Sequence, residues 1–274
     1  MKLSNQQFDR TRRLALRLAG IELVERHREL IGRRSRRLGI ADGAAFDDLL
    51  GAAEHGEAAA SEEVLCLLTT KFTAFFRHPR HFEAAAHHAL RAVGERGRAR
   101  LWSAAAATGE EPYSLAMNLI EAFHQENPPA EILATDVAKD ALTVAEQAEY
   151  SEAALAGVDP KRRERFLRPG GNSGRWSMVP VVRRLVQFHM LNLAAKNWPV
   201  EGPFDVIFCR NALMYLETSH RHAALEHIAA LLAPDGLLLL DPSEHLGKAA
   251  HLFKSFGGGL YHLSGCSSTT TLTS

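Results

Sequence analysis

The pattern of hydrophobic and polar positions changes at about residue 98. Before that point, apolar residues alternate irregularly with charged ones, and we expect helices at residues 44–53, 62–68 and 79–93 as well as in the first 30 residues. Pro79 stands near the first turn of one of these helices, a position that proline favours. Residues 54–61 are small and polar and predict a loop. We expect no strand before about residue 99.

Beyond residue 98, short apolar runs alternate with helical segments. We expect strands at residues 99–103, 131–135, 205–209 and 237–241, and helices at residues 111–123, 138–147 and 220–232. A turn at Pro234–Gly236 is expected to separate the last helix from the last strand. This alternation predicts a mostly parallel sheet in an α/β fold, with ligands bound at the carboxyl ends of its strands.

The segment from residue 151 to residue 192 interrupts the alternation. It contains a basic run at residues 161–165 and a Gly-rich turn at residues 169–174. Two β-like stretches follow, at residues 176–182 and 185–190. We interpret the segment as a small antiparallel insertion. The tail from Ser264 to Ser274 is rich in Ser and Thr, which predicts disorder.

Composition narrows the function classes. The 274 residues include 32 Lys and Arg and 32 Asp and Glu, a net charge of zero that argues against a wholly basic nucleic-acid or membrane binder but leaves room for a local basic patch. Cys66, Cys209 and Cys266 fit neither a metal knuckle nor a disulfide framework, which favours the reduced cytoplasm. No signal peptide or membrane span is predicted.

Three of the predicted strands end in polar residues. The first is followed by small residues and then Glu110 and Glu111; its single glycine, Gly109, does not meet the dinucleotide fingerprint. The two carboxylates suit a cationic amino group, although stabilisation of the helix dipole explains them equally well. Asp136, after the second strand, suits ribose hydroxyls or caps a helix. Asn211 follows the third strand.

These segments together carry a resemblance. The chain has W-S-A-A-A-A-T-G-E-E-P-Y-S from residue 102, A-T-D from residue 134, F-D-V-I-F-C-R-N-A-L-M-Y from residue 204 and L-A-P-D-G-L-L-L-L from residue 232, with L-T-T-K-F-T-A-F-F-R upstream from residue 68. In order and spacing they resemble the chemotaxis receptor methyltransferase family of the CheR type. The similarity runs from about residue 10 to about residue 262.

The resemblance implies a cofactor, a reaction and a domain order. S-adenosylmethionine would donate the methyl group, leaving S-adenosylhomocysteine, and glutamate side chains of a receptor would accept it as methyl esters. The implied fold is a small all-helical N-terminal domain and a Rossmann-like methyltransferase domain with an inserted antiparallel β-subdomain. We expect the helical domain at residues 1–70 and the linker with a connecting helix at residues 71–97. The methyltransferase domain is expected at residues 98–264, with its insertion at residues 151–191, and a disordered tail at residues 265–274.

Site residues follow from the same resemblance. Glu111 would hold the methionine amino group and Asp136 the ribose hydroxyls, and Arg77 and Tyr215 would be catalytic, near the transferring methyl group. No metal is expected. The residues implied to bind the cofactor are Thr73, Arg77, Ala105, Glu111, Asp136, Asn192, Leu193, Asn211 and Ala212.

In three places the sequence departs from the family pattern. Lys71 stands where the family often has Asn, and Ala148 where Gly is usual. Asp241-Pro242-Ser243-Glu244 stands where the family has Gly, then His or Ser, then Ser-Glu. The last change lies at the end of a core strand, on the acceptor side of the expected pocket.

Basic residues are frequent in the N-terminal region, and the spacing of Arg33, Arg36 and Arg37 places them on one helical face. A solvated face is the ordinary interpretation. The resemblance favours a docking surface for the acidic helices of the cytoplasmic region of a chemoreceptor. We expect a cytoplasmic monomer with no nucleic-acid partner and no direct membrane insertion; whether the β-subdomain binds a receptor peptide stays open.

Other functions remain as alternatives. A non-catalytic regulator that binds S-adenosylmethionine or S-adenosylhomocysteine would use the same pocket. A methyltransferase acting on nucleic acid is disfavoured by the zero net charge and the lack of interleaved aromatic and basic residues. A small-molecule acceptor is a further alternative, and an NAD-dependent dehydrogenase is disfavoured by the single-glycine loop.

Overall fold

The structure is a computed structural model that describes residues 2–69, 73–171 and 174–265.

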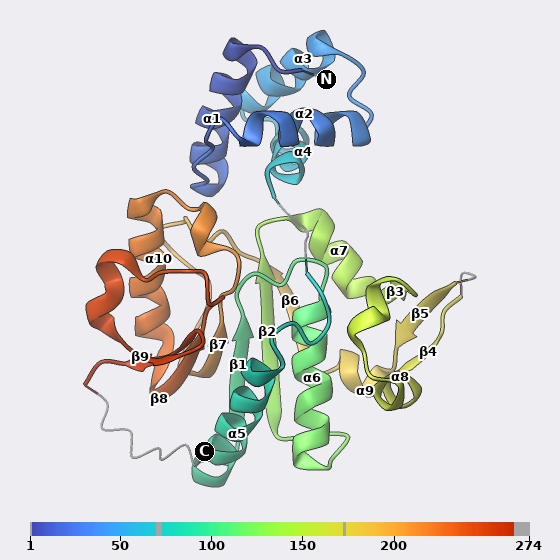
Figure 1. Cartoon of the computed structure of the whole chain (residues 1–274), viewed down its shortest axis with the longest axis vertical. Coiled ribbons are helices and arrows are strands. Elements are labelled where there is room, and N and C mark those ends of the chain that lie inside the picture. Colours follow the sequence, from blue (N-terminus) through green and yellow to red (C-terminus); the bar gives the residue numbers. More distant parts are fainter. Residues whose placement is uncertain (1, 70–72, 172–173, 266–274) are drawn as a thin grey trace.

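The first four helices form a layer of their own. Helices α1 to α4 pack around a separate core that includes Phe8 and Phe46, and lie above the sheet in Figure 1. Their bounds are Asn5–Ala19 for α1, His27–Arg37 for α2, Gly43–Glu54 for α3 and Ala58–Leu68 for α4.

Local chemistry sets the ends of these helices. Ser4 and Gln7 form a reciprocal capping box at the start of α1, and Gly20 ends it in the left-handed conformation. The loop predicted at residues 54–61 is too long, because α4 already begins at Ala58. The residues that follow Glu57 are alanines, the strongest helix formers, so they extend the helix toward its N-terminus.

The second part of the chain forms an α/β sandwich around a mixed sheet. Its strand order is β6-β2-β1-β7-β8-β10-β9, and β6, β2, β1, β7 and β8 run parallel. The strands are β1 (Ala99–Ser103), β2 (Ala130–Asp136), β6 (Val186–Met190), β7 (Phe204–Phe208), β8 (Leu232–Leu239), β9 (Phe253–Gly257) and β10 (Leu260–Leu263). This confirms the mostly parallel α/β sheet predicted from the alternating pattern and the Rossmann-like domain implied by the family resemblance.

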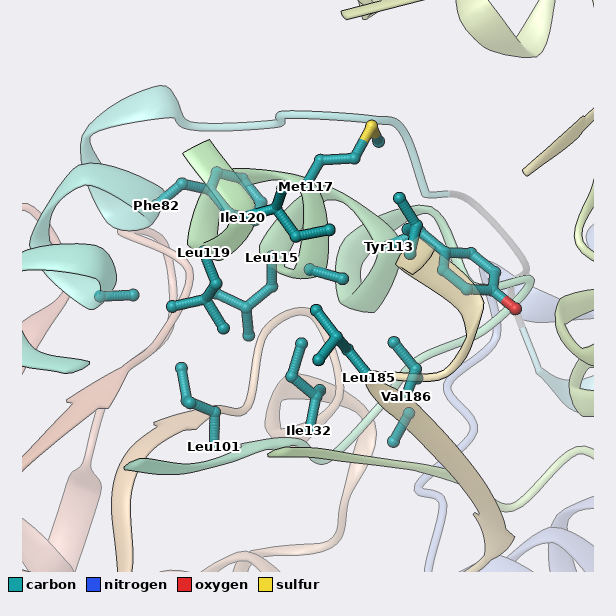
Figure 2. Close-up of a cluster of buried hydrophobic side chains, with 14 of the residues drawn as sticks. Phe82, Leu101, Tyr113, Leu115, Met117, Leu119, Ile120, Ile132, Leu185 and Val186 are labelled. Carbon is teal, nitrogen blue, oxygen red and sulfur yellow. The ribbon is translucent and has the colours of Figure 1, made fainter. Parts of the chain in front are cut away.

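Helices cover both faces of the sheet. Helices α5 (Pro79–Arg96) and α6 (Glu110–Phe123) lie on one face, where Leu115 and Leu119 of α6 point toward Leu101 and Ile132 of the strands (Figure 2). Helix α10 (Thr218–Leu231) packs on the other face through a second cluster that includes Trp102. Helix α7 (Lys139–Gln147) contacts β2 and β6. Burial on both faces explains why β7 and the end of β8 are almost wholly apolar.

Two details of the sheet differ from prediction. The turn expected at Pro234–Gly236 lies inside β8, which begins at Leu232; pairing with β7 jumps from Leu232 to Leu237, so these residues form an irregularity in the strand. The antiparallel hairpin of β9 and β10 was not predicted from the sequence. Its strands are short and partly exposed, so they lack a long apolar run.

The predicted insertion forms a small antiparallel sheet, in the order β3-β5-β4. Its elements are β3 (Glu149–Ser151), η1 (Ala154–Gly157), α8 (Pro160–Phe166), β4 (Leu167–Pro169), β5 (Arg175–Met178) and α9 (Pro180–Arg183). The stretch 185–190 was wrongly assigned to it: as β6 it pairs in parallel with β2 of the main sheet. Residues 266–274 of the predicted disordered tail lie outside the described residues.

The helical layer is attached at the carboxyl edge of the main sheet. Ile21 pairs with Leu216 in an isolated bridge, the backbone N–H of Glu22 donates to the carbonyl of Tyr215 at 2.9 Å, and that of Glu217 donates to Gly20 at 2.8 Å. The end of α1 therefore sits directly beside the loop that follows β7.

Candidate functional site

A cavity of about 400 Å³ opens between the helical layer and the carboxyl ends of β1, β2, β6 and β7. That volume lies within the range of small-molecule sites. The sheet contributes the loops that follow each strand, and the helical layer contributes Ala19, Ile21, Leu68 and Thr69 as a roof.

The structure brings the predicted site residues together around this cavity. Each of the residues expected to bind the cofactor lines it, as does Tyr215 (Thr73, Arg77, Ala105, Glu111, Asp136, Asn192, Leu193, Asn211, Ala212). Lys71 lies outside the described residues. The predicted docking residues Arg33, Arg36 and Arg37 are elsewhere, exposed on α2.

Glu111 is buried in the first turn of α6, where its carboxylate is held from two sides. Ser103 Oγ donates to Oε1 at 2.8 Å, and Arg210 Nε donates to Oε2 at 2.6 Å. Both partners of the ion pair are almost fully buried. Arg210 was not among the predicted site residues, although a charged residue directly after a buried apolar strand could have pointed to it.

The loop between β1 and α6 lets a ligand approach the backbone. Ala104, Ala105 and Ala107 line the cavity with short side chains. Gly109 has a φ of 95°, and a Cβ there would lie 2.7 Å from the Tyr150 hydroxyl oxygen, so a larger residue does not fit. The loop is therefore shaped by its small residues, as its sequence indicated.

Asp136 ends β2 at the cavity wall. Its Oδ2 accepts from the backbone N–H of Ala107 and its Oδ1 from that of Ala138, both at 2.9 Å. Burial raises the pKa of Asp136 above its ordinary value and outweighs these hydrogen bonds, which lower it. The backbone N–H of Val137 also interacts with this carboxylate, which with about four acceptor positions keeps one for a hydroxyl donor. Asp136 thus both stabilises the turn before α7 and faces the cavity.

Glu244 holds the loop that follows β7. Its Oε2 accepts from the backbone N–H groups of Asn211 (2.9 Å) and Asp241 (3.1 Å), and its Oε1 from that of Met214 (3.3 Å). Asn211 has a φ of 58°, an uncommon conformation that Asn tolerates. Burial raises the pKa of Glu244, which the sequence prediction had not assigned to the site.

Asn192 joins the cavity to the helical layer. Its side-chain Nδ2 donates to the carbonyl of Leu18 at 2.8 Å, and its Oδ1 accepts from the backbone N–H of Ala194 at 2.9 Å. The side-chain amide is therefore engaged within the protein, and Leu193 presents the adjacent apolar surface to the cavity.

Arg77 and Tyr215 reach the same cavity from different directions. Arg77 lies in a short segment between α4 and α5, and its Nη2 is 3.2 Å from Asp241 Oδ2. Tyr215 ends the short helix η2 (Leu213–Tyr215) that follows β7. The cavity thus has an anionic wall at Glu111 and Asp136 and a cationic group at Arg77.

This arrangement suits S-adenosylmethionine. The carboxylates of Glu111 and Asp136 complement an amino group and a ribose diol, and the small-residue loop admits a bulky nucleoside. A Rossmann-like sheet with such a pocket at its carboxyl edge defines the class of S-adenosylmethionine-dependent methyltransferases.

Comparison with known proteins identifies the family. Residues 71–261 match the family described as CheR methyltransferase, SAM binding domain. The chain is 37% identical to chemotaxis protein methyltransferase 2 of Pseudomonas aeruginosa, over 94% of this chain and 93% of that protein. It is 36% identical to the chemotaxis protein methyltransferase of Escherichia coli, over 96% and 93% of the two chains. The chain belongs to the CheR methyltransferase family.

In the described part of the chain, no group of three or more His, Cys, Asp or Glu side chains is arranged to hold a metal ion. Across the same residues, no helix combines the length and apolar character needed to cross a membrane.

Proposed function

We propose that the protein transfers the methyl group of S-adenosylmethionine to glutamate side chains in the cytoplasmic region of a chemoreceptor. The observation that carries this proposal is the convergence of Glu111, Asp136, Arg77 and Tyr215 on one cavity of a CheR-family fold. The similarity to chemotaxis methyltransferases over nearly the whole chain supports a receptor as the acceptor.

Within the cavity, we assign the cofactor contacts as follows. Glu111 binds the methionine amino group, and Asp136 binds the ribose hydroxyls through the lone pairs that their internal hydrogen bonds leave free. Asn192 and Leu193 flank the adenine. Thr73, Ala105, Asn211 and Ala212 form the remaining walls.

The chemistry requires positioning more than acid or base catalysis. S-adenosylmethionine, when bound, supplies an electrophilic methyl group. A glutamate side chain has a pKa of about 4.3 and is already ionised at neutral pH, so the acceptor needs no general base. The acceptor oxygen bonds to the methyl carbon as the carbon–sulfur bond breaks in line with it. The products are a glutamate methyl ester and S-adenosylhomocysteine.

Arg77 and Tyr215 are the groups that we assign to this step. The Arg77 guanidinium lines the cavity and attracts the acceptor carboxylate, and Tyr215 orients the reacting groups from the opposite loop. The roof formed by the helical layer keeps water from the reacting charges, which favours a transition state in which they neutralise each other.

We assign different roles to the two parts of the chain. Residues 1–70 form the docking domain, residues 71–97 the linker with its connecting helix, and residues 98–264 the methyltransferase domain. Arg33, Arg36 and Arg37 of α2 dock acidic receptor helices. The protein then works as a monomer in the cytoplasm, where the receptor's signalling region lies.

A transfer assay tests the proposal. The full-length protein is incubated with radiolabelled S-adenosylmethionine and chemoreceptor-containing membranes, and the label on protein is treated with base. Base-labile label that maps to receptor glutamates is the expected result, because methyl esters hydrolyse in base. Cofactor binding without any protein label would contradict the proposal and favour the regulatory alternative.

An Arg77→Ala variant tests the role of the arginine. We expect it to lose about 100-fold in turnover, about 2.7 kcal/mol of transition-state stabilisation, and to lose less than about tenfold in affinity for S-adenosylhomocysteine, because Arg77 is only one of the residues that line the cavity. Calorimetric binding and initial rates measure the two effects. Normal turnover in this variant would remove Arg77 from the mechanism.

A further inference from the structure

Asp241 stands where the family has glycine, and in the structure this carboxylate faces Arg77. Asp241 Oδ2 lies 3.2 Å from Arg77 Nη2 and 3.3 Å from His78 Nε2. Asp241 is only 5% exposed and follows the interior strand β8. The departure from the family pattern therefore places an additional charge beside the proposed catalytic arginine.

The carboxylate of Asp241 has a fixed orientation. Its Oδ1 accepts from the Ser243 backbone N–H at 3.0 Å and from Ser243 Oγ at 2.7 Å, which leaves Oδ2 turned toward Arg77. Burial by itself would raise the pKa of Asp241, but the hydrogen bonds from Ser243 and Asn211 and the charge of Arg77 outweigh burial and hold it far below its ordinary value. The carboxylate is therefore ionised at neutral pH, beside the Arg77 guanidinium.

The segment that carries Arg77 is strained and needs to be held. Phe76 and His78, on either side of Arg77, have φ values of 53° and 60°, in the left-handed region that is sterically unfavourable for residues other than glycine. The Phe76 backbone N–H donates to Ser114 Oγ at 3.0 Å, and Arg210 Nη1 donates to the Arg77 carbonyl at 2.7 Å. These contacts fix the backbone, whereas Asp241 acts on the side chain.

Asp241 acts from behind the wall of the cavity. Arg77 and Ser243 line the cavity, whereas Asp241 is not one of the described residues that do. The carboxylate therefore contacts the guanidinium on the side away from the ligand. An arginine side chain has many rotamers, so fixing it in advance lowers the entropic cost of reaching the transition state.

We propose that Asp241 is a positioning residue for methyl transfer, which holds the Arg77 guanidinium at the cavity wall, where the guanidinium meets the acceptor carboxylate. This inference rests on the proposed function, since it assumes that Arg77 faces the acceptor.

A double-mutant cycle of Asp241→Asn and Arg77→Ala tests the inference. Asp241→Asn keeps the size and one acceptor oxygen of the side chain, and is expected to lower kcat about tenfold while KM for S-adenosylmethionine changes less than twofold. Combined with Arg77→Ala, it should cause no further loss, because Asp241 acts through Arg77. Multiplicative losses in the double variant, or full activity of Asp241→Asn, would overturn the proposal. Asp241→Glu restores the charge and is expected to recover part of the rate.

A second measurement does not depend on activity. Nitrogen-15 NMR of arginine side chains reports rotation about the Cζ–Nη bonds, which should be slow for Arg77 in the wild-type protein and faster in Asp241→Asn. Arg210, held by Glu111 in both proteins, is the internal control. Unchanged Arg77 rotation in Asp241→Asn would refute the positioning role. Failure of the wild-type protein to methylate a receptor would refute the proposed function, and the NMR test of Asp241 would still apply.

Discussion

At the residue scale, the cofactor pocket is built on a buried ion pair. Glu111 is buried in the wall of the cavity, and Arg210 both neutralises it and connects it to the Arg77 backbone. Burying an ionised carboxylate is costly unless it is paired and hydrogen-bonded. The pair thus makes it possible for an anionic group to remain charged beside an apolar core.

Removing one partner of the Glu111–Arg210 pair should therefore destabilise the folded protein. We expect Arg210→Met to lower the free energy of unfolding by about 3–5 kcal/mol, because Glu111 is left buried without its cation. Urea titration at pH 7 measures the change. Lys139→Met is the control, since it breaks an exposed pair with Glu62 and should cost less than about 1 kcal/mol. Equal losses in the two variants would show that the buried pair has no special weight.

A buried histidine predicts how stability depends on pH. Burial, with the nearby charge of Arg91, lowers the pKa of His88 to about 4, whereas an unfolded histidine titrates near 6.5. As the pH falls below about 6.5, the unfolded chain gains a proton that folded His88 does not take up, so stability is lost between about pH 6.5 and pH 4.

Variants of His88 check this assignment. We expect His88→Gln to lose about 2 kcal/mol less stability than the wild-type protein between pH 7 and pH 5 in denaturant titrations. The exposed neighbour His87 provides the matched control, and His87→Gln should follow the wild-type curve. His81 and His262, whose pKa values burial also lowers, keep part of the pH dependence. A wild-type slope in His88→Gln would contradict the assignment.

At the element scale, the arginines of α2 divide into two groups. Arg28 and Arg34 are engaged within the protein: Arg28 pairs with Glu25, and Arg34 donates to the carbonyls of Leu67 and Leu68 at the end of α4. Arg33, Arg36 and Arg37 are exposed, and the structure assigns them no ion pair with any described residue. Only the second group is available to an acidic partner.

Reversing these charges should weaken receptor methylation alone. We expect a variant with Glu at residues 33, 36 and 37 to lose at least about tenfold in receptor methylation at low salt, because screened attraction governs such docking. Affinity for S-adenosylhomocysteine should stay within twofold, since none of the three lines the cavity.

The control carries the same change in net charge elsewhere. Glu at Arg98, Lys248 and Lys254, which are exposed on the sheet domain, should leave receptor methylation within about twofold. If both triple variants lose activity equally, net charge rather than α2 governs docking.

The end of α7 explains another departure from the family pattern. Ala148 has a φ of 55° and caps α7 in the left-handed conformation. Glycine adopts this conformation without the steric cost that a Cβ imposes. The change from the family's usual glycine therefore affects a helix end and does not reach the cavity.

At the scale of the whole molecule, the junction of the two parts completes the pocket. The end of α1 supplies part of the roof, and Gly20 allows it to pack closely against the sheet domain. Gly20 has a φ of 63°, and a Cβ there would lie 2.4 Å from Ala194 Cβ. Asn192 and Glu217 bond to the same turn from the sheet side. We therefore expect cofactor binding and domain arrangement to be coupled.

A Gly20→Ala variant tests this coupling. We expect at least about tenfold weaker binding of S-adenosylhomocysteine, because the added methyl group pushes the roof away from Ala194. Gly39→Ala is the matched control: its φ of 80° is also left-handed, but a Cβ there meets no atom within 4 Å. It should lose about 1 kcal/mol of stability and keep its affinity. Equal affinities in the two variants would contradict a role for the junction in binding.

The sequence by itself determined the local features of this protein. The alternation after residue 98 predicted β1 and α6 nearly to the residue, because periodicity and turn chemistry act over short stretches of chain. The small-residue loop before α6 and the polar ends of the strands located the cavity at the carboxyl edge of a parallel sheet.

Tertiary structure alone decided which distant residues meet. Asp241 and Arg77 are 164 residues apart, and Arg210 and Glu111 are 99 apart. No periodicity records such pairs, since they follow from strand order and from how α1 sits on the sheet. The place of β6 in the main sheet was decided in the same way, because an edge strand has a similar local pattern in either sheet.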